Sequence, residues 1–442
     1  MRGLMIPMAA GIVVAPLAGA APALAQASEA RAPVDVAKLV AATRALLNRH
    51  YVLPALRPKF DAMLAEGLAA GRYADPDPEA VVRKINADLG RVTPDKHLGL
   101  MYDPAQSRAL AAAPPNAGAD DAPPSAADIA NAAKQNHGLV QLKLLPGNIR
   151  YLETTGFVWA GEPSERAYDD AMRFLAGGDA VIIDMRRNGG GDPSAVRYMV
   201  SHFLPPNRPL MTFYMGSDRV DTSASLPALR APRMVGKPLY VLTSGGSASA
   251  AEEFIGHVAG YKLGEIIGEK SAGAGFRNEF FALPEGMVIS ISVGRAVLAS
   301  TGKDWEGVGI APTTVVPVDK ALETAQVHAL RRLAQTAAPA DRPELEAAAT
   351  LLAAQVQPVA TALPLAAYAG TFGERSVTLE DGKLAFQRRG GHKISIVPIG
   401  ANRFAFVDDA RTQLEFAVAG TAVTGFELFR NDGSRVVATR NP

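Results

Sequence analysis

The chain has 442 residues, of which 48% are hydrophobic and 20% are charged, and its formal net charge is +1. This length exceeds what one hydrophobic core usually supports, so we expect two or three domains. The near-zero charge, without a basic stripe, argues against nucleic acid as a partner. The absence of cysteine excludes disulfides, thiolate metal sites and a lipid-modified N-terminal cysteine.

The first 25 residues have the pattern of a secretory signal peptide. Arg2 supplies the positive charge, an apolar stretch runs from Leu4 to Leu17, and Ala23-Leu24-Ala25 fits the small-x-small cleavage pattern. The alternative is a single-span anchor, but prolines and glycines break the stretch, and it is short for a span of about 20 residues. We therefore expect an exported mature chain without a membrane span, most simply in a bacterial periplasm.

The next two segments differ in composition. Residues 30–103 show apolar residues at helical spacing, for example Leu39, Ala42 and Leu46, and this spacing predicts an N-terminal helical subdomain. Residues 104–137 are dominated by Ala, Pro, Asp and Ser, which predicts an Ala/Pro-rich linker or exposed loop.

Residues 138–323 alternate between strand and helix patterns, which indicates an α/β core. The runs at 180–184 and 238–243 are almost continuously apolar, as expected of strands covered on both faces. A helical connector is expected over residues 324–360. Residues 361–442 contain short alternating strands with hairpin signals at Asp381-Gly382 and Asp432-Gly433, which predict a separate small antiparallel β domain.

Ser249 is the strongest candidate for a nucleophile. It follows the apolar run at 238–243 and a turn of small residues, and it precedes an amphipathic helix. A hydroxyl at a helix N-terminus lies beside free backbone N–H groups and the helix dipole, which favour the negative charge that develops in acyl transfer. The segment Ser249-Ala250-Ala251-Glu252 is also a capping box, in which the serine would only hold the helix start.

A nucleophilic serine needs a base, and the histidine positions favour His97. His257 would lie two turns into the helix that Ser249 starts, so its side chain cannot fold back to that terminus. His97 instead lies in a turn, Thr93-Pro94-Asp95-Lys96-His97, before a short strand. Loops positioned by a scaffold are where catalytic residues tend to occur.

Two glycine-containing turns leave alternatives open. Asn188-Gly189-Gly190-Gly191 can present backbone N–H groups as an oxyanion hole, or it can be only a tight strand-to-helix turn. Gly245-Gly246-Ser247-Ala248-Ser249 begins like the nucleophile elbow of α/β-hydrolases, but it lacks the final glycine. In that esterase interpretation Ser247 would be the nucleophile, with His328 or His392 downstream.

In combination, these motifs resemble the core of the C-terminal processing (tail-specific) serine peptidases. The similarity is greatest to the branch with the tricorn core and the interphotoreceptor retinoid-binding-protein-like repeats. The stretches that carry the resemblance are, in order, Asp95–Leu98, Leu145–Leu152, Ile183–Gly191, Ser249–Phe254 and Trp305–Pro312. The resemblance covers most of residues 34–323 and implies an α/β fold, a ClpP/crotonase-like spiral of ββα units.

The resemblance also implies hydrolysis of peptide bonds through an acyl-enzyme. Ser249 matches the nucleophile, His97 the general base, and Glu306 the residue that orients the base. The backbone N–H groups that match the oxyanion hole are those of Ala250 and of Gly190 or Gly191. No cofactor or metal is implied, and the expected partner is a peptide or protein substrate. Because retinoid-binding relatives use this fold without evident proteolysis, a catalytically silent module that binds a peptide or a lipophile is the alternative.

One departure from the family pattern bears on the base. Peptidases of the Ser–Lys type carry a lysine after the nucleophile's helix, and here Ala274 occupies that position. Lys270 lies nearby but is out of register. The departure favours a triad with His97 over a Ser–Lys dyad. We also find no PDZ-like segment between the helical region and the core, so capture of substrate C-termini by such a domain is not implied.

Overall fold

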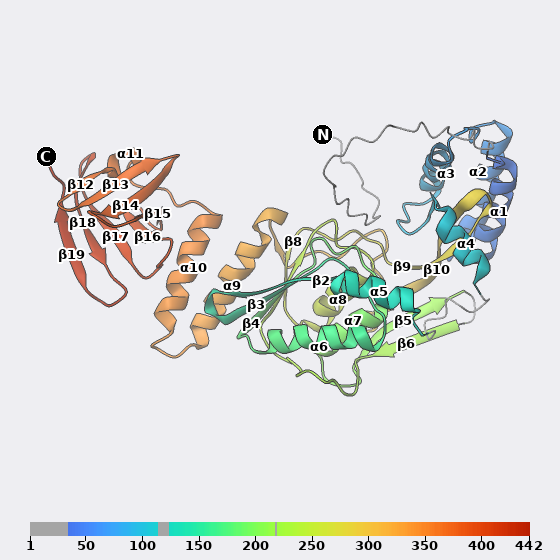
Figure 1. Cartoon of the computed structure of the whole chain (residues 1–442), viewed down its shortest axis with the longest axis horizontal. Helices are drawn as coiled ribbons and strands as arrows, with labels where there is room; N and C mark the ends of the chain where they lie inside the picture. The colour runs from blue at the N-terminus through green and yellow to red at the C-terminus, as the bar shows by residue number, and fades with distance from the viewer. Residues whose placement is uncertain (1–33, 114–122, 217–218) are drawn as a thin grey trace, which may run out of the picture.

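The computed structural model describes residues 34–113, 123–216 and 219–442. Within these ranges, helices on an antiparallel sheet form one end of the molecule, a helix-covered sheet forms the middle, and a β domain forms the other end (Figure 1). The expected signal peptide, residues 1–25, lies outside the described residues. Among the described helices, none has both the length and the apolar character needed to cross a bilayer.

The central sheet has the strand order β11-β8-β7-β4-β3-β2. Its strands are β2 (Leu139–Leu145), β3 (Ile149–Thr154), β4 (Ala180–Asp184), β7 (Leu239–Thr243), β8 (Glu265–Gly268) and β11 (Thr314–Val315). Neighbours from β3 to β11 are parallel, and the edge strand β2 is antiparallel to β3. This is the α/β core that the alternating sequence pattern predicts.

Helices cover both faces of the central sheet. One face packs against α6 (Glu162–Ala176), α7 (Pro193–Ser201) and α8 (Ala250–Tyr261), and the other against α9 (Ala321–Thr336) and α10 (Arg342–Val356). Val181 and Ile183 of β4 belong to the first cluster, whereas Ile182 belongs to the second. Since successive side chains of a strand point to opposite faces, both covered faces require apolar residues, which explains the unbroken apolar runs.

The N-terminal helices pack on a second sheet, which is antiparallel. The helices are α1 (Val36–His50), α2 (Arg57–Ala69) and α3 (Pro78–Val92), and the strands are β1 (Gly99–Tyr102), β5 (Pro209–Met215), β6 (Arg219–Ala224), β9 (Phe276–Ala282) and β10 (Met287–Leu298). Ile289 and Ile291 of β10 pack in the N-terminal core, whereas Leu298 packs in the central core. The long strand β10 therefore connects the two cores.

The stretch at 104–137 is not the plain linker that its composition predicts. It contains α4 (Pro104–Ala112) and α5 (Ala126–Lys134). The carboxylate of Asp103 accepts hydrogen bonds from the N–H groups of Ala105 and Gln106 in α4, and the hydroxyl of Ser125 accepts one from the N–H of Asp128 in α5. Alanine is the strongest helix former, so with these caps the alanine-rich sequence folds as helices despite its prolines.

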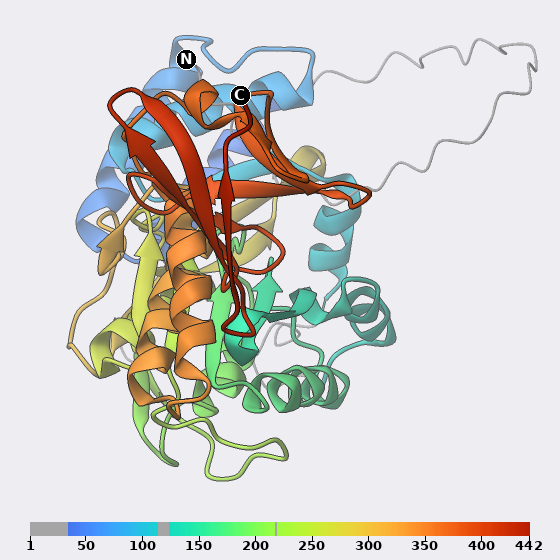
Figure 2. The same ribbon diagram turned by 90° about the vertical axis from the view of Figure 1, so that its left-hand side faces the viewer.

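The C-terminal part forms the predicted antiparallel β domain. Its elements are α11 (Leu365–Tyr368), β12 (Gly370–Phe372), β13 (Arg375–Glu380), β14 (Lys383–Arg388), β15 (Lys393–Pro398), β16 (Arg403–Phe406), β17 (Gln413–Ala419), β18 (Ala422–Phe429) and β19 (Arg435–Thr439). Each strand pairs with the next, and Asp381-Gly382 forms the predicted hairpin between β13 and β14. Aromatic side chains such as Phe404 and Phe416 fill its own core. In Figure 2 this domain lies in front of α10.

Candidate active site

Ser249 lies at the N-cap of α8, after β7 and a short turn, as its sequence context predicts. Its backbone has a φ of 56° and a ψ of −121°. A positive φ is rare for a residue with a side chain and costs roughly 1–3 kcal/mol, and strain of this kind is concentrated at functional sites. The N–H of Ser249 donates to Oε2 of Glu252 at 3.0 Å, and this bond helps to hold the strained conformation.

Glu252 does more than cap the helix. Its side chain is fully buried and accepts hydrogen bonds from Ser271 Oγ at 2.6 Å, from the N–H of Gly273 at 2.6 Å and from the N–H of Ala274 at 2.7 Å. With the bond from Ser249, the carboxylate accepts four donors. It thereby joins the start of α8 to the loop at 271–275, which follows β8.

Ser247, the nucleophile of the esterase interpretation, is fully buried. Its hydroxyl donates to the carbonyl of Met185 at 2.7 Å and accepts from the N–H of Ser244 at 3.0 Å. These bonds use the hydroxyl to hold the turn, so the structure gives Ser247 no route to a substrate.

The glycine-rich turn after β4 packs directly against Ser249. A Cβ on Gly190 would come within 2.7 Å of the Ser249 Cβ, so only glycine permits this approach. The N–H of Gly190 already donates to Oδ1 of Asn188 at 2.9 Å. The N–H groups of Gly191 and Ala250 make no hydrogen bond within the described chain. Of the two predicted glycines, Gly191 is therefore the one with a free donor, beside Ala250.

A pocket of about 190 Å³ opens beside Ser249. Its lining residues are Gly191, Asp192, Pro193, Phe213, Ser249, Ala250, Glu253, Ala274, Gly275, Phe276, Arg277, Asn278, Ala296 and Trp305. Ala274, at the position of the family's lysine, is thus in the pocket wall, whereas Lys270 is exposed outside it. The chain offers no lysine from this loop to Ser249.

His97 is held in a loop that contacts the 271–275 loop. Its N–H donates to Oδ1 of Asp95 at 2.9 Å, and Asp95 in turn accepts from the Tyr51 hydroxyl at 3.1 Å. The ammonium group of Lys96 donates to the carbonyl of Ala272. The pairing of β1 with β10, in which Gly99 lies opposite Ser290, fixes the other end of the loop.

The imidazole of His97 is partly buried, and its Nδ1 has no hydrogen-bond partner. Burial lowers the pKa of His97 below its ordinary value, although the charges of Asp95 and Glu252 oppose this effect. The ring is therefore neutral at neutral pH, the form in which an imidazole accepts a proton.

Glu306 lies against the same loop. Its Oε2 accepts from the N–H groups of Gly275 at 2.6 Å and Phe276 at 3.0 Å. Burial raises the pKa of Glu306 to about 7, and the nearby carboxylates of Asp95 and Glu252 act in the same direction. The charges of Asp95 and Glu252 thus influence both His97 and Glu306, which shows that these groups gather around the 271–275 loop.

Within the described chain, no hydrogen bond joins the side chains of Ser249, His97 and Glu306. Catalytic contacts often shorten only when substrate is bound, so separation in the free protein does not remove a residue from the site. The backbone contacts of the 271–275 loop connect the segments that carry the three residues. The sequence reasoning missed the roles of Asp95 and Asn188 here, although both lie inside motifs that it singled out.

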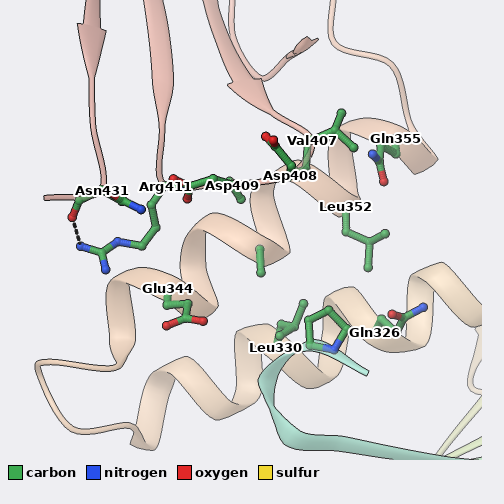
Figure 3. Close-up of a pocket in the computed structure, with 14 residues that line it drawn as sticks. Gln326, Leu330, Glu344, Leu352, Gln355, Val407, Asp408, Asp409, Arg411 and Asn431 are labelled. Atoms are coloured by element: carbon green, nitrogen blue, oxygen red, sulfur yellow. Dashed lines mark hydrogen bonds between the residues drawn. The ribbon is translucent and has the colours of Figure 1, made fainter. Parts of the chain in front are cut away.

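Another pocket, of about 530 Å³, lies between α9, α10 and loops of the β domain (Figure 3). Its wall includes Leu330, Leu352, Asp408 and Arg411, whose guanidinium donates to the carbonyl of Asn431 at 2.8 Å. No serine, cysteine or histidine lines it. It therefore has no group suited to acyl transfer, unlike the pocket at Ser249.

Residues 148–316 match the model of a known family, peptidase family S41. Over this segment the chain is therefore similar to the S41 peptidases. The predicted resemblance to the C-terminal processing peptidases is thereby confirmed. The matched segment contains Ser249, Ala250, both glycines and Glu306, whereas His97 lies upstream of it.

Individual proteins resemble this chain over part of its length. The carboxyl-terminal-processing protease of Synechocystis sp. is 28% identical over 169 residues, which are 37% of this chain and 38% of that protein. The structure of a putative peptidase from Parabacteroides merdae has a TM-score of 0.48 and 17% identity and covers 67% of this chain and 96% of its own. The photosystem II D1 C-terminal processing protease has a TM-score of 0.38 and 17% identity, and the match covers 65% of this chain and 94% of its own.

Proposed function

We propose that this chain is a serine peptidase that hydrolyses peptide bonds through an acyl-enzyme, with Ser249 as the nucleophile. The observation that carries the proposal is the strained N-cap of α8. Ser249 lines a pocket there, next to free N–H groups, inside a segment that matches peptidase family S41. The chain spans only 38% of the length of the Synechocystis relative. The proposed activity is therefore argued from the site in this chain rather than from that relative.

In the proposed mechanism, the hydroxyl oxygen of Ser249 attacks the scissile carbonyl while the imidazole of His97 takes its proton. The N–H groups of Ala250 and Gly191 donate to the oxyanion of the tetrahedral intermediate, and the imidazolium then protonates the leaving amine. Water hydrolyses the acyl-enzyme by the same route. Removing one such oxyanion donor typically lowers kcat by about 10²–10³-fold, which is the scale of help expected from each N–H.

The proposed base is His97, oriented by Glu306. The neutral state of the imidazole and the contact of its loop with the 271–275 loop support this role. An ionised Glu306 would stabilise the imidazolium that forms during attack.

A fluorophosphonate probe tests the nucleophile, because it reacts covalently with activated serines. We expect labelling of the wild-type protein and none of Ser249→Ala. His97→Ala should lower the labelling rate by at least about 100-fold, since general-base catalysis contributes roughly 10²–10⁴-fold.

Ser247→Ala is the matched control. It removes a buried hydroxyl with two hydrogen bonds, so we expect lower stability but continued labelling of the folded protein. Labelling that disappears in Ser247→Ala and persists in Ser249→Ala would support the esterase instead. A folded wild-type protein without labelling would support the silent binding module.

We also propose that the chain is exported to the periplasm of a bacterium. The signal-like pattern of residues 1–25 supports export. A mature N-terminus directly after Ala25, read by mass spectrometry, is the expected observation, whereas an intact Met1 on the folded protein would contradict it.

A further inference from the structure

Glu253 is a nearly buried carboxylate that the proposed mechanism does not use. It lies in the first turn of α8, is 5% exposed, and lines the pocket beside Ser249. Within the described chain, the one basic side chain within 4 Å of its carboxylate is that of His257, whose Nε2 lies 3.6 Å from the Glu253 Oε1. That separation is too long for a hydrogen bond. The carboxylate therefore faces the pocket without a donor.

The helix dipole accounts for only part of this arrangement. A carboxylate in the first turn of a helix is stabilised by the dipole, so a charge is tolerated at this position. A buried carboxylate without hydrogen bonds nevertheless carries a large desolvation cost. The adjacent Glu252 shows how this chain satisfies a buried carboxylate with a structural role, because it accepts four hydrogen bonds. Glu253 accepts none and is left for an external donor.

The pocket has the size and walls for one long side chain. Its volume of about 190 Å³ is below the roughly 300–1,000 Å³ of small-molecule sites. Phe213, Phe276 and Trp305 give it an aromatic wall, against which a methylene chain can pack.

The charges that line the pocket are two carboxylates, Asp192 and Glu253, and one guanidinium, Arg277. Asp192 already caps α7 by accepting from the N–H of Ser194 at 2.7 Å. The guanidinium of Arg277 lies over the ring of Phe213, with its carbon 5.6 Å from the ring centre. Glu253 is thus the charged group in the pocket wall whose demand for a partner is unmet.

We infer that this pocket binds a lysine or arginine side chain of the substrate, at the residue whose carbonyl Ser249 attacks, and that Glu253 determines this specificity. The inference rests on the proposed peptidase function. A substrate ammonium or guanidinium would give Glu253 the charge-assisted hydrogen bond that the free protein lacks. Because the carboxylate is already nearly buried in the free protein, substrate binding removes little further water from it.

Peptidyl diphenyl phosphonates that differ only in the side chain next to phosphorus provide the test. We expect the lysine compound to inactivate the wild-type protein at least about tenfold faster than the norleucine compound, which has a similar shape without the charge. The glutamate compound should react more slowly than norleucine. Equal rates for lysine and norleucine would overturn the inference, and a preference for glutamate would assign the pocket to Arg277 instead.

Glu253→Gln should reduce the ratio of lysine to norleucine rates by about tenfold, because the amide keeps the shape but loses the charge. Glu269→Gln removes an exposed carboxylate outside the pocket and should leave the ratio unchanged. An undiminished ratio in folded Glu253→Gln would overturn the role of Glu253. If Glu253→Gln does not fold, the comparison of lysine with norleucine in the wild-type protein still decides.

The same experiment separates this inference from the proposed function. A wild-type protein that a fluorophosphonate labels, but that shows no preference for lysine, contradicts the specificity alone. A protein that no phosphorus reagent labels contradicts the peptidase. In that case, fluorescence anisotropy with Ser249→Ala compares binding of lysine and norleucine peptides, and equal binding also overturns the inference.

Discussion

Glu306 combines burial with a position near other carboxylates, and its pKa of about 7 follows from these two causes. Its charge therefore changes close to neutral pH, where an ordinary glutamate is already ionised. The imidazole of His97 shifts in the opposite direction, because burial disfavours its charged form. At the residue scale, the proposed base and its orienting acid are both tuned by desolvation.

The pKa of Glu306 predicts a pH dependence of reactivity. The rate of fluorophosphonate labelling should rise with pH and show an apparent pKa near 7, since the ionised carboxylate stabilises the imidazolium of His97. In Glu306→Gln, the rise of the labelling rate near pH 7 should disappear, and only the rise at lower pH that belongs to His97 should remain. The measurement is the labelling rate from pH 5 to 9. A limb near pH 7 that persists in Glu306→Gln would refute the assignment, and Glu279→Gln, an exposed site, is the control.

The same pKa predicts a pH dependence of stability. Because the pKa of Glu306 is higher in the folded than in the unfolded state, the folded protein binds the proton more tightly. This contribution to stability is fully present below about pH 4.5 and is lost as pH rises to about 7. Between pH 5 and 8, the free energy of unfolding should fall by about 2–3 kcal/mol more in the wild type than in Glu306→Gln. Urea unfolding at pH 5 and at pH 8 measures the free energy of unfolding. An equal fall in the wild type and in Glu306→Gln would contradict the raised pKa of Glu306.

At the scale of elements, the loop at 271–275 is the meeting point of the site. Its backbone contacts Glu252 at the start of α8, Glu306 and Lys96, and its Ala274 carbonyl accepts from the indole N–H of Trp305 at 3.0 Å. Glu252 is the strongest of these connections, because one buried carboxylate accepts three donors from the loop.

Glu252→Ala should therefore separate α8 from the loop. It leaves several buried donors without an acceptor, and each such donor costs about 1–3 kcal/mol, so we expect the protein to lose at least about 3 kcal/mol of stability. The labelling rate of Ser249 should also fall, since its strained backbone loses the bond from its own N–H. Denaturant unfolding and labelling of the folded fraction measure the two effects. Glu279→Ala is the exposed control, and a stability loss of the same size there would contradict the explanation.

The sequence predicts well what depends on local patterns. Almost continuous apolar runs located β4 and β7, and the small-residue turn placed Ser249 at a helix start. The sequence could not predict contacts between segments that are distant along the chain. From the sequence, Glu252 is identified only as a capping residue. Its bonds to Gly273 and Ala274 depend on how a later loop folds back, which local patterns do not show. For the same reason the sequence left Gly190 and Gly191 as equals, until the bond from Gly190 to Asn188 distinguished them.

At the scale of the whole molecule, the two ends relate differently to the middle. The N-terminal helices pack on β10, which lies within the segment that matches family S41, and β1 brings the His97 loop to the same sheet. The β domain has a hydrophobic core of its own, and the pocket of Figure 3 lies at its border with α9 and α10. The N-terminal helices are therefore part of the proposed site, and the β domain is not.

Removal of residues 361–442 should accordingly leave the site intact. The core clusters around the central sheet and the N-terminal helices contain no residue of the β domain, so we expect labelling within about twofold of the full chain. Melting should occur a few degrees lower, because α10 loses its contacts with β15 of the β domain. The labelling rate of the purified truncated chain is the measurement. Loss of labelling in a folded truncated chain would show that the β domain contributes to the site.

The pairing of β1 with β10 also sets when the site can form. His97 and Ser249 are separated by 152 positions, and the strand that follows His97 pairs with residues 287–290, which come after Ser249 in the chain. Pairings between distant segments are slow, because the chain loses much freedom before any contact compensates for it. In a growing or unfolded chain, the proposed nucleophile and the proposed base therefore stay apart until β1 has paired with β10.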